Sequence, residues 1–391
     1  MKKMNIKTMI KRILSILLGL GITLLFNIIL LSYFPNIRRI DRTFVLICIM
    51  YVSGILFLIL WNKTKSKLVY LLFVVPVACI GIEIGIDKYR AYIRKIPRVY
   101  EEFSLHNYEP FREDNILPVL DEASNFKITE NLPVLDGATA FYPVYAAFVQ
   151  AVYPKKRYRH WEAPVLCNRT PNAYNNLLEG KADLIFCLEP SEMQMQQLYS
   201  SDNNIKLVPI GKEAFVFFVN SRNQVNNVTL EDIQGIYSGR IKNWIKLNGS
   251  YKNIRAYQRP KNSGSQTILE KIMGTVPIIK PPIEDIKAGM ETIIGQVAVY
   301  KNFNNAIGYS FLQYSTEMLK NDQIKILSIN GIYPSIETMQ DNSYPFIVNF
   351  YAIYNDTENK NENIEPFIEW ILSRQGQILV SKTGYIPIIN D

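Results

Sequence analysis

From Leu132 onward, short apolar runs alternate with amphipathic ones along the chain. Strands are predicted where a few consecutive residues are apolar, and helices where apolar residues recur three and four positions apart. The predicted strands are 132–135, 164–167 and 182–188, and the predicted helices are 142–152 and 171–179. This βαβαβ order predicts a parallel sheet with helices on its faces. In such a sheet a ligand binds beyond the carboxyl ends of the strands, near helix N-termini.

A second series of strands and helices follows. The pattern predicts strands at 214–220, 254–257 and 345–354, helices at 230–237, 268–273 and 364–372, and a closing extended segment at 384–387. Thr229 is a favourable N-cap for the helix that begins at Leu230. The chain thus has a first series of strands and helices, then a middle series, and finally a strand and a helix that return to the first. This order predicts an α/β domain of two lobes, joined by strands that cross from one lobe to the other.

Three apolar runs precede this domain, at 13–34, 43–61 and 68–86. Each is close to the roughly 20 residues that a membrane-spanning helix needs. They predict a three-helix transmembrane anchor at 1–86, followed by a stalk or linker at 87–125 and the two-lobed domain at 126–391. Basic residues flank the runs on both sides, so the charges alone leave the orientation of the anchor open.

The remaining composition narrows the chemistry. The formal net charge is +8, but many basic residues flank the apolar runs and no nucleic-acid-binding motif is present, so no nucleic-acid partner is expected. The four cysteines show no metal-ligand or disulfide spacing, and the two histidines, His106 and His160, are expected at the surface or at a boundary. No nucleophile–base set or cofactor motif is visible. We therefore expect no enzyme activity, no metal and no cofactor.

Two turns between a predicted strand and a predicted helix carry candidate binding chemistry. The segment 136–140, Asp-Gly-Ala-Thr-Ala, has a glycine and a hydroxyl before a helix, and 263–265, Ser-Gly-Ser, follows Arg259 by a few residues. The unpaired N–H groups and dipole of a helix N-terminus attract anions, and an arginine matches oxyanion geometry. Each turn alone is typical of an ordinary helix cap, whereas two such turns in separate halves of the chain indicate an anion site.

Four segments resemble the substrate-binding proteins of phosphate (Pst-type) ABC transporters. They are the turn at 136–145, the run 228–244 (VTLEDIQGIYSGRIKNW), the loop 259–267 (RPKNSGSQT) and the late segment 370–377 (WILSRQGQ). The resemblance covers roughly residues 130–390. It implies a periplasmic-binding-protein-like fold outside the membrane, which places 87–391 on the extracytoplasmic side of a multi-pass membrane protein.

By position, the resemblance implies a set of ligand contacts: Thr139, Ala140, Thr170, Arg259, Ser263, Gly264 and Ser265. Two departures from the family pattern change the expected site. Where the family has an Asp that accepts the proton of hydrogen phosphate, this chain has Glu189 in the matching turn; either Glu189 takes over that role or the role is lost. Lys261 replaces an Asp of the arginine loop, which removes an acceptor and adds positive charge.

The function that follows is a membrane-anchored solute-binding protein. It would clamp phosphate or a similar oxyanion between its lobes for an ABC-type uptake system, with the anion, the membrane and an ABC permease as partners. The alternative is a membrane-bound sensory or protein-interaction module that reuses the same fold.

Overall fold

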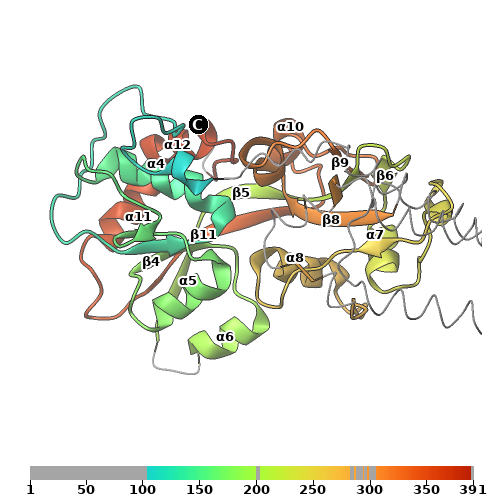
Figure 1. The fold of residues 1–391 in the computed structure, drawn as a ribbon. Coiled ribbons are helices and arrows are strands. Elements are labelled where there is room, and N and C mark those ends of the chain that lie inside the picture. The colour runs from blue at the N-terminus through green and yellow to red at the C-terminus, as the bar shows by residue number, and fades with distance from the viewer. Residues whose placement is uncertain are drawn as a thin grey trace, which may run out of the picture. The chain divides into compact units, whose positions relative to one another are not determined.

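A computed structural model describes residues 104–199, 203–281, 286–287, 294, 297–298 and 305–388. The chain divides into two units at Ile96/Pro97, and every described residue belongs to the second unit. This unit has two lobes, and a single sheet runs through both in the order β2-β3-β1-β4-β11-β5-β8-β7 (Figure 1).

The first lobe contains the parallel part of the sheet. The strand β1 (Leu135–Gly137) pairs in parallel with β3 (Val165–Leu166) and with β4 (Leu184–Cys187), and β2 (Trp161–Glu162) lies at the edge. The helices of this lobe are α4 (Tyr142–Val152), α5 (Arg169–Leu178), α6 (Glu192–Tyr199), α11 (Ile364–Leu372) and α12 (Arg374–Lys382). The predicted strand–helix alternation is therefore confirmed for this lobe.

Two long strands connect the lobes. The first half of β5 (Ile205–Asn220) pairs antiparallel with β11 (Ile347–Asn355), and its second half pairs with β8 (Ala306–Phe311). Figure 1 shows β5 and β11 running from one lobe into the other. Because these strands continue through both lobes, we call β5 and β11 the hinge strands.

The second lobe surrounds the far half of β5. Its remaining strands are β7 (Arg255–Ala256) and β9 (Ile324–Ile326), with a small separate sheet of β6 (Asn227–Val228) and β10 (Ser328–Ile329). Its helices include α7 (Leu230–Tyr237), α8 (Gly264–Met273) and α10 (Ile336–Gln340). The predicted N-cap of α7 is confirmed: the Thr229 hydroxyl accepts from the Asp232 N–H, and the Asp232 carboxylate accepts from the Thr229 N–H.

The segment 104–125, predicted as part of a stalk, lies against the first lobe. Its short 3₁₀ helix η1 (Leu105–Tyr108) contacts α4, and the side chains of Tyr108 and Leu117 are buried. The Lys382 ammonium of α12 donates to the Val119 carbonyl and the Asp121 carboxylate, at 3.1 and 2.8 Å. The described part of this segment is therefore packed onto the lobe.

The prediction of a three-helix transmembrane anchor is corrected. No helix among the described residues is long and apolar enough to cross a membrane. The helix α4 has 11 residues, which span about 17 Å, whereas the hydrocarbon core of a bilayer is about 30 Å thick. The apolar runs at 13–34, 43–61 and 68–86 lie outside the described residues. The anchor and the multi-pass membrane localisation are therefore not retained.

Candidate anion-binding site

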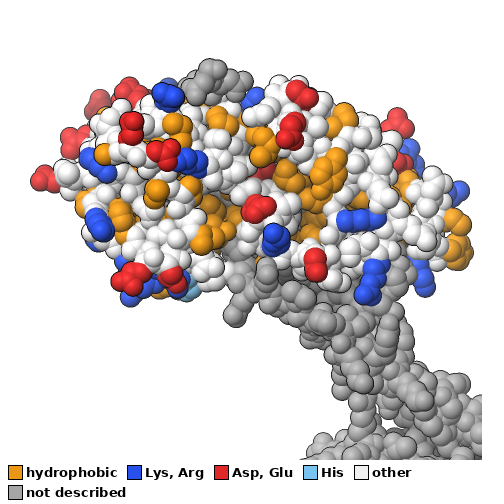
Figure 2. Space-filling model, turned by 90° about the horizontal axis from the view of Figure 1, so that it is seen from above, with side chains coloured by type: hydrophobic (Ala, Val, Ile, Leu, Met, Phe, Trp, Pro, Cys, Tyr) orange, Lys and Arg blue, Asp and Glu red, His pale blue; other side chains and the backbone are white. Residues whose placement is uncertain are grey.

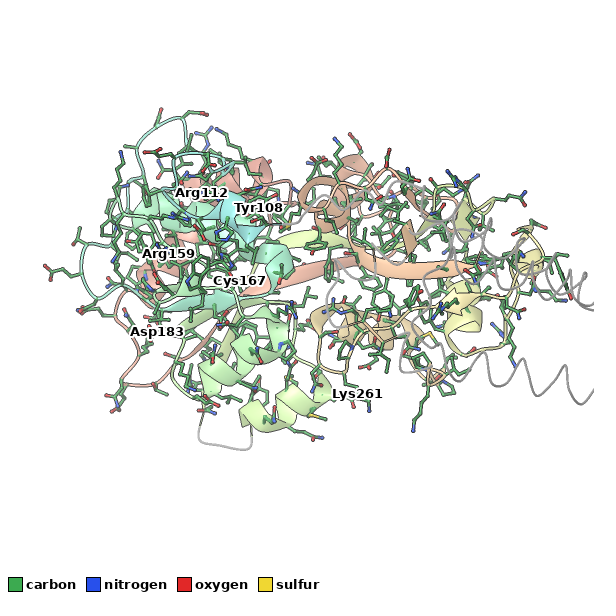
Figure 3. All side chains as sticks on the ribbon, in the orientation of Figure 1. Tyr108, Arg112, Arg159, Cys167, Asp183 and Lys261 are labelled. Carbon is green, nitrogen blue, oxygen red and sulfur yellow. The ribbon has the colours of Figure 1, made fainter. Side chains whose placement is uncertain are left out.

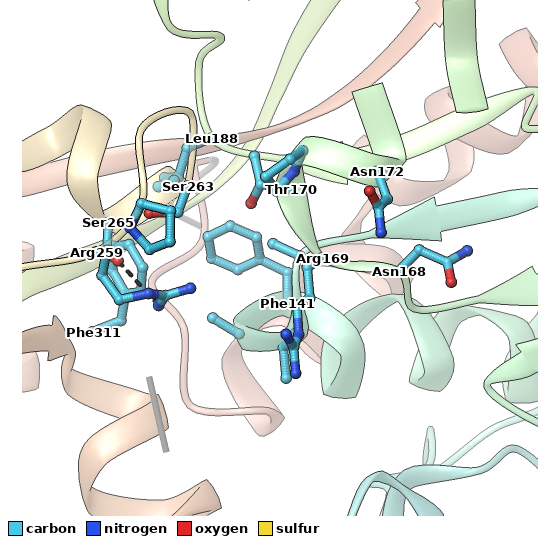
Figure 4. Close-up of a pocket in the computed structure, with 16 residues that line it drawn as sticks. Phe141, Asn168, Arg169, Thr170, Asn172, Leu188, Arg259, Ser263, Ser265 and Phe311 are labelled. Atoms are coloured by element: carbon cyan, nitrogen blue, oxygen red, sulfur yellow. Dashed lines mark hydrogen bonds between the residues drawn. The ribbon is translucent and has the colours of Figure 1, made fainter. Parts of the chain in front are cut away.

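A cavity of about 210 Å³ lies where turns of the two lobes meet (Figure 4). Its lining comes from the turns that follow β1, β3 and β4 in the first lobe, from the loop between β7 and α8 in the second, and from the end of β8. The sixteen lining residues are Ala138, Thr139, Ala140, Phe141, Asn168, Arg169, Thr170, Pro171, Asn172, Leu188, Arg259, Pro260, Ser263, Gly264, Ser265 and Phe311. The cavity therefore lies beyond the carboxyl ends of the parallel strands, as predicted.

A buried carboxylate organises the first-lobe side of the cavity. The Asp136 side chain, fully buried, accepts four hydrogen bonds of 2.7–2.9 Å: two at Oδ1 from the N–H groups of Gly137 and Asn168, and two at Oδ2 from the side-chain amides of Asn168 and Asn176. These bonds hold the turn after β1 against the turn that opens α5. Gly137 fits here because a Cβ would lie 2.7 Å from the Phe186 carbonyl oxygen.

The first residue of α5 is an arginine that the sequence analysis did not single out. Arg169 has a φ of +69°, which is unusual for a residue other than glycine. Strained backbone of this kind is often retained at functional sites. Thr170, next to it, is buried, and its oxygen points toward the cavity in Figure 4. The sequence did contain a signal for Arg169: it is a basic residue directly before Thr170, the predicted hydroxyl donor.

The second lobe supplies Arg259 and two serines at the N-terminus of α8. The Arg259 guanidinium donates to the Ser265 hydroxyl at 3.4 Å, and the Arg259 N–H donates to the Tyr309 hydroxyl at 2.8 Å. Tyr309 also bonds the Gln266 side chain, which fixes the loop to the start of the helix. Ser263 is 4% exposed, and its hydroxyl has no hydrogen-bond partner among the described residues. A buried hydroxyl in this position is available to a ligand in the cavity.

Gly264 marks a close approach of the two lobes. A Cβ on this residue would lie 3.1 Å from the Leu188 side chain and 3.2 Å from the Thr170 hydroxyl, both of the first lobe. With a larger residue here, the Leu188 and Thr170 side chains would have to shift by a few tenths of an ångström. The glycine therefore lets the N-terminus of α8 face the N-terminus of α5 across the cavity.

Comparison with known proteins agrees with this geometry. A model of the PBP superfamily domain matches residues 133–375. The chain belongs to the PBP superfamily. The matched range covers all strands of the sheet that the structure describes and every residue that lines the cavity.

The similar proteins within this superfamily include phosphate-binding proteins. A PstS of Borreliella burgdorferi is 25% identical over 181 residues, which are 45% of this chain and 63% of that protein. A PstS of Staphylococcus aureus is 24% identical over 263 residues, 64% of this chain and 76% of that protein. These relatives confirm the resemblance predicted from the sequence.

A solved structure also shares the fold. It is a substrate-binding protein from Clostridium perfringens, described as belonging to a phosphate ABC transporter and solved with bound phosphate. The TM-score is 0.51 at 23% identity, and the match covers 68% of this chain and all of that one. The two-lobed fold predicted from the sequence is thus confirmed.

Of the eight predicted ligand contacts in this PBP domain, seven line the cavity. They are Thr139, Ala140, Thr170, Arg259, Ser263, Gly264 and Ser265. The eighth, Glu189, does not, and the position beside it, Leu188, does. Lys261, which was expected to add charge to the site, also lies outside the lining (Figure 3). Geometry at the end of β4 decides which of two neighbouring side chains faces inward, and sequence alone does not specify this.

Glu189 instead joins the two lobes at the edge of the cavity. Its carboxylate pairs with the Lys271 ammonium of α8 and accepts from the Tyr351 hydroxyl of the hinge strand β11 at 2.8 Å. The hydrogen bond from Lys271 lowers the pKa of Glu189. Beside this pair, the Ser191 hydroxyl donates to the Asn262 side chain at 2.8 Å. Glu189, Lys271, Ser191 and Asn262 form a set of interlobe contacts that we term the latch.

The charge of the lining is positive. It contains Arg169 and Arg259, and none of its described residues is an aspartate or glutamate. Hydroxyl groups, amides and helix N-termini provide the other polar contacts. Such a lining suits a small anion, and among its described residues there is no carboxylate to accept a proton from one.

Proposed function

We propose that the cavity binds a phosphate-like oxyanion between the lobes and that the chain delivers this anion to an ABC-type uptake system. The proposal rests on one observation: Arg259 lines the same cavity as hydroxyl groups from both lobes. These hydroxyl groups lie at the N-termini of α5 and α8, which face each other across the cavity. Delivery rests on the curated relatives, which are phosphate-binding proteins, and an ABC permease is the partner that such delivery requires.

Binding proceeds by closure of the lobes around the anion. When the lobes are apart, water solvates both turns; closure replaces that water with fixed donors, which interact more strongly in the drier site. The guanidinium of Arg259 offsets the charge of the anion, and Thr170 and Ser263 offer hydroxyl donors from opposite sides. The strands β5 and β11 carry the hinge, and the latch adds contacts that exist only in the closed form.

The proposal is tested by titrating phosphate into the purified chain and following the heat of binding. We expect one anion per chain with a dissociation constant in the micromolar range or tighter. Arg259→Ala is expected to weaken binding by at least about 100-fold, because it removes one of the two positive charges of the lining together with the hydrogen bonds that this guanidinium would donate to the anion. Lys261→Ala is the matched control: it removes a basic residue from the same loop but not from the lining, so affinity should change little.

A failure of this titration would favour the alternative function. If a folded chain binds neither phosphate nor sulfate, the capture proposal is wrong, and a sensory or interaction module that reuses the fold becomes the better account. Equal loss of affinity in the Arg259 and Lys261 variants would also contradict the proposed site, since it would show only a general effect of positive charge.

A further inference from the structure

The two histidines of the chain meet at one buried carboxylate, away from the anion cavity. His106 and His160 are the only histidines in the sequence. The Nδ1 atoms of His106 and His160 lie 3.0 and 3.1 Å from the same oxygen, Oε1 of Glu109. None of the three residues lines the cavity. Two segments that are distant in the sequence thus bring three ligand-type side chains together on the first lobe.

The surroundings hold these side chains in place. The Glu109 side chain is fully buried, and its other oxygen, Oε2, accepts two hydrogen bonds from Arg157 at 3.0 and 2.7 Å. Trp161 packs edge-on against both imidazole rings, with centroids 5.1 and 4.6 Å apart. Arg157 therefore orients the carboxylate so that Oε1 faces the imidazoles, much as outer hydrogen bonds orient ligands in metal sites.

The spacing of the three donor atoms suits a metal ion. All three lie within 4.8 Å of one another. Zinc binds imidazole nitrogen and carboxylate oxygen at about 2.0–2.2 Å in tetrahedral geometry, so neighbouring ligand atoms around it lie about 3.3–3.6 Å apart. The observed separations between Nδ1 and Oε1, 3.0 and 3.1 Å, are slightly shorter, so each imidazole would move outward by a few tenths of an ångström to admit the ion. The side chain of His106 is 43% exposed and that of His160 is 20% exposed, which leaves one side open for water ligands and for entry of the ion.

A neighbouring tyrosine adds a second, independent observation. The Tyr142 ring lies edge-on to His160, with centroids 6.0 Å apart. Its hydroxyl is buried and has no hydrogen-bond partner among the described residues. Buried polar groups normally have a partner, so this hydroxyl is consistent with a further group in the region, such as a metal-bound water.

We propose that His106, Glu109 and His160 bind one divalent transition-metal ion of the zinc class. Two imidazoles and one carboxylate are borderline ligands that favour zinc, nickel or copper over magnesium or calcium. The ion would tie the 3₁₀ helix η1 and Glu109 to the loop before β2. The positive charge of Arg157 opposes the ion, so the affinity should be modest, with a dissociation constant in the micromolar range.

The alternative is a purely hydrogen-bonded triad. In that case each imidazole carries a proton on Nδ1 and donates it to Oε1, and no ion is needed. The metal site and the hydrogen-bonded triad place the same protein atoms in nearly the same positions. They differ mainly in whether a metal ion or protons lie between the imidazoles and the carboxylate. Direct metal binding distinguishes them.

The test uses the full chain without a polyhistidine tag, stripped of metal with a chelator and titrated with Zn²⁺ alone. We expect one ion per chain, and His106→Gln and His160→Gln should each weaken binding at least about tenfold. Glutamine keeps an amide that can donate to Glu109, so a hydrogen-bonded network is disturbed little. Glu162→Gln, a nearby exposed acid outside the triad, is the matched control and should bind Zn²⁺ like the unmodified chain.

Thermal unfolding provides the second readout. Zn²⁺ should raise the melting temperature of the unmodified chain but not of the His106→Gln/His160→Gln double variant, because a ligand stabilises only the state that binds it. The proposal is overturned if the chain takes up no Zn²⁺, or if the double variant takes it up equally well. Phosphate titration of the same samples keeps this result separate from the proposed function, because the triad and the cavity share no residue.

Discussion

At the scale of single residues, Glu213 is the clearest departure from ordinary side-chain behaviour. It lies on the hinge strand β5, where pairing with β11 gives way to pairing with β8, and its side chain is buried. Burial raises the pKa of its carboxyl to about 8, against the smaller opposite effect of hydrogen bonds from the N–H groups of Ala214 and Gln313. A proton is therefore held at the hinge at neutral pH.

This raised pKa predicts a loss of stability with rising pH. In the unfolded chain the carboxyl ionises near pH 4.5, so between that pH and about 8 the folded state holds a proton that the unfolded state has released. The free energy of unfolding should fall across this range, by about 1.4 kcal/mol per pH unit from this group. Glu213→Gln should remove that slope in urea unfolding measured from pH 5 to 8. Identical slopes for the variant and the unmodified chain would refute the assignment, and Glu231→Gln, on the surface, is the control.

The other decisive residue is Leu188, which lines the cavity on the turn where the resembled family has a proton-accepting Asp. Hydrogen phosphate carries a proton and sulfate does not, so a carboxylate in the lining discriminates against sulfate by repulsion. Because the lining has none among its described residues, we expect the unmodified chain to bind sulfate within about tenfold of phosphate. Leu188→Asp should lower the affinity for sulfate relative to phosphate by at least about 100-fold.

Competition between the two anions in one titration measures this selectivity. Leu188→Asn is the control, because it introduces a polar side chain of similar size without the charge. If the unmodified chain already rejects sulfate, another group in the cavity accepts the proton and the role assigned to Leu188 is wrong.

At the scale of elements, the sequence predicts those whose pattern is local. The helices α7 and α11 have the bounds predicted for them, because a cap at Thr229 and a regular apolar spacing define their ends. The helix α8 begins at Gly264, four residues before its predicted start at Ile268, since its first turn is buried at the lobe contact and tertiary packing outweighs the weak helix propensity of Ser-Gly-Ser.

Strands are predicted less well, for a physical reason. Only 214–220 of β5 reads as a strand, because Pro209 and Gly211 interrupt the pattern. Pairing with β11 extends the strand to Ile205, and Gly211 is needed there because a Cβ would lie 2.5 Å from the Phe350 ring. Contacts between distant segments set these features, and the same holds for the inward position of Leu188 and for the meeting of His106 with His160.

The latch is the element-scale feature that should affect binding without touching the anion. Lys271→Ala removes the interlobe ion pair with Glu189. The side chains of Lys271 and Glu189 are both about half exposed, so solvent screens their interaction. We expect phosphate affinity to fall by about two- to fivefold, mainly through faster dissociation, and the difference to shrink in 1 M salt. Stopped-flow dissociation measures this. Lys246→Ala, in the short helix η3 (Trp244–Leu247) of the second lobe, is the matched control.

Two results would contradict this role for the latch. A loss of more than about 100-fold would mean that Lys271 contacts the anion or is required for folding. A loss that is the same at low and high salt would mean that the ion pair is not its source.

At the scale of the whole molecule, the proposed binding requires that the two lobes share one ligand. Acidic and basic side chains both occur across the face shown in Figure 2, separated by neutral and hydrophobic ones. The positive charge that matters is instead placed in the cavity by Arg169 and Arg259. The two-lobed fold with its crossing strands follows from sequence patterns and family resemblance, and seven of the eight predicted ligand contacts line the cavity. The latch, by contrast, is visible only in the structure, because it joins side chains that are far apart in the sequence.

Whether one anion bridges the two lobes is best measured by titrating phosphate into two variants that each lack one hydroxyl, one in each lobe. If one anion contacts both lobes, Thr170→Val in the first and Ser263→Ala in the second should each weaken binding by at least about tenfold, since each removes a hydrogen bond to a charged ligand. Wild-type affinity in either variant, with the fold intact, would show that the anion is held by one lobe alone and would contradict the account.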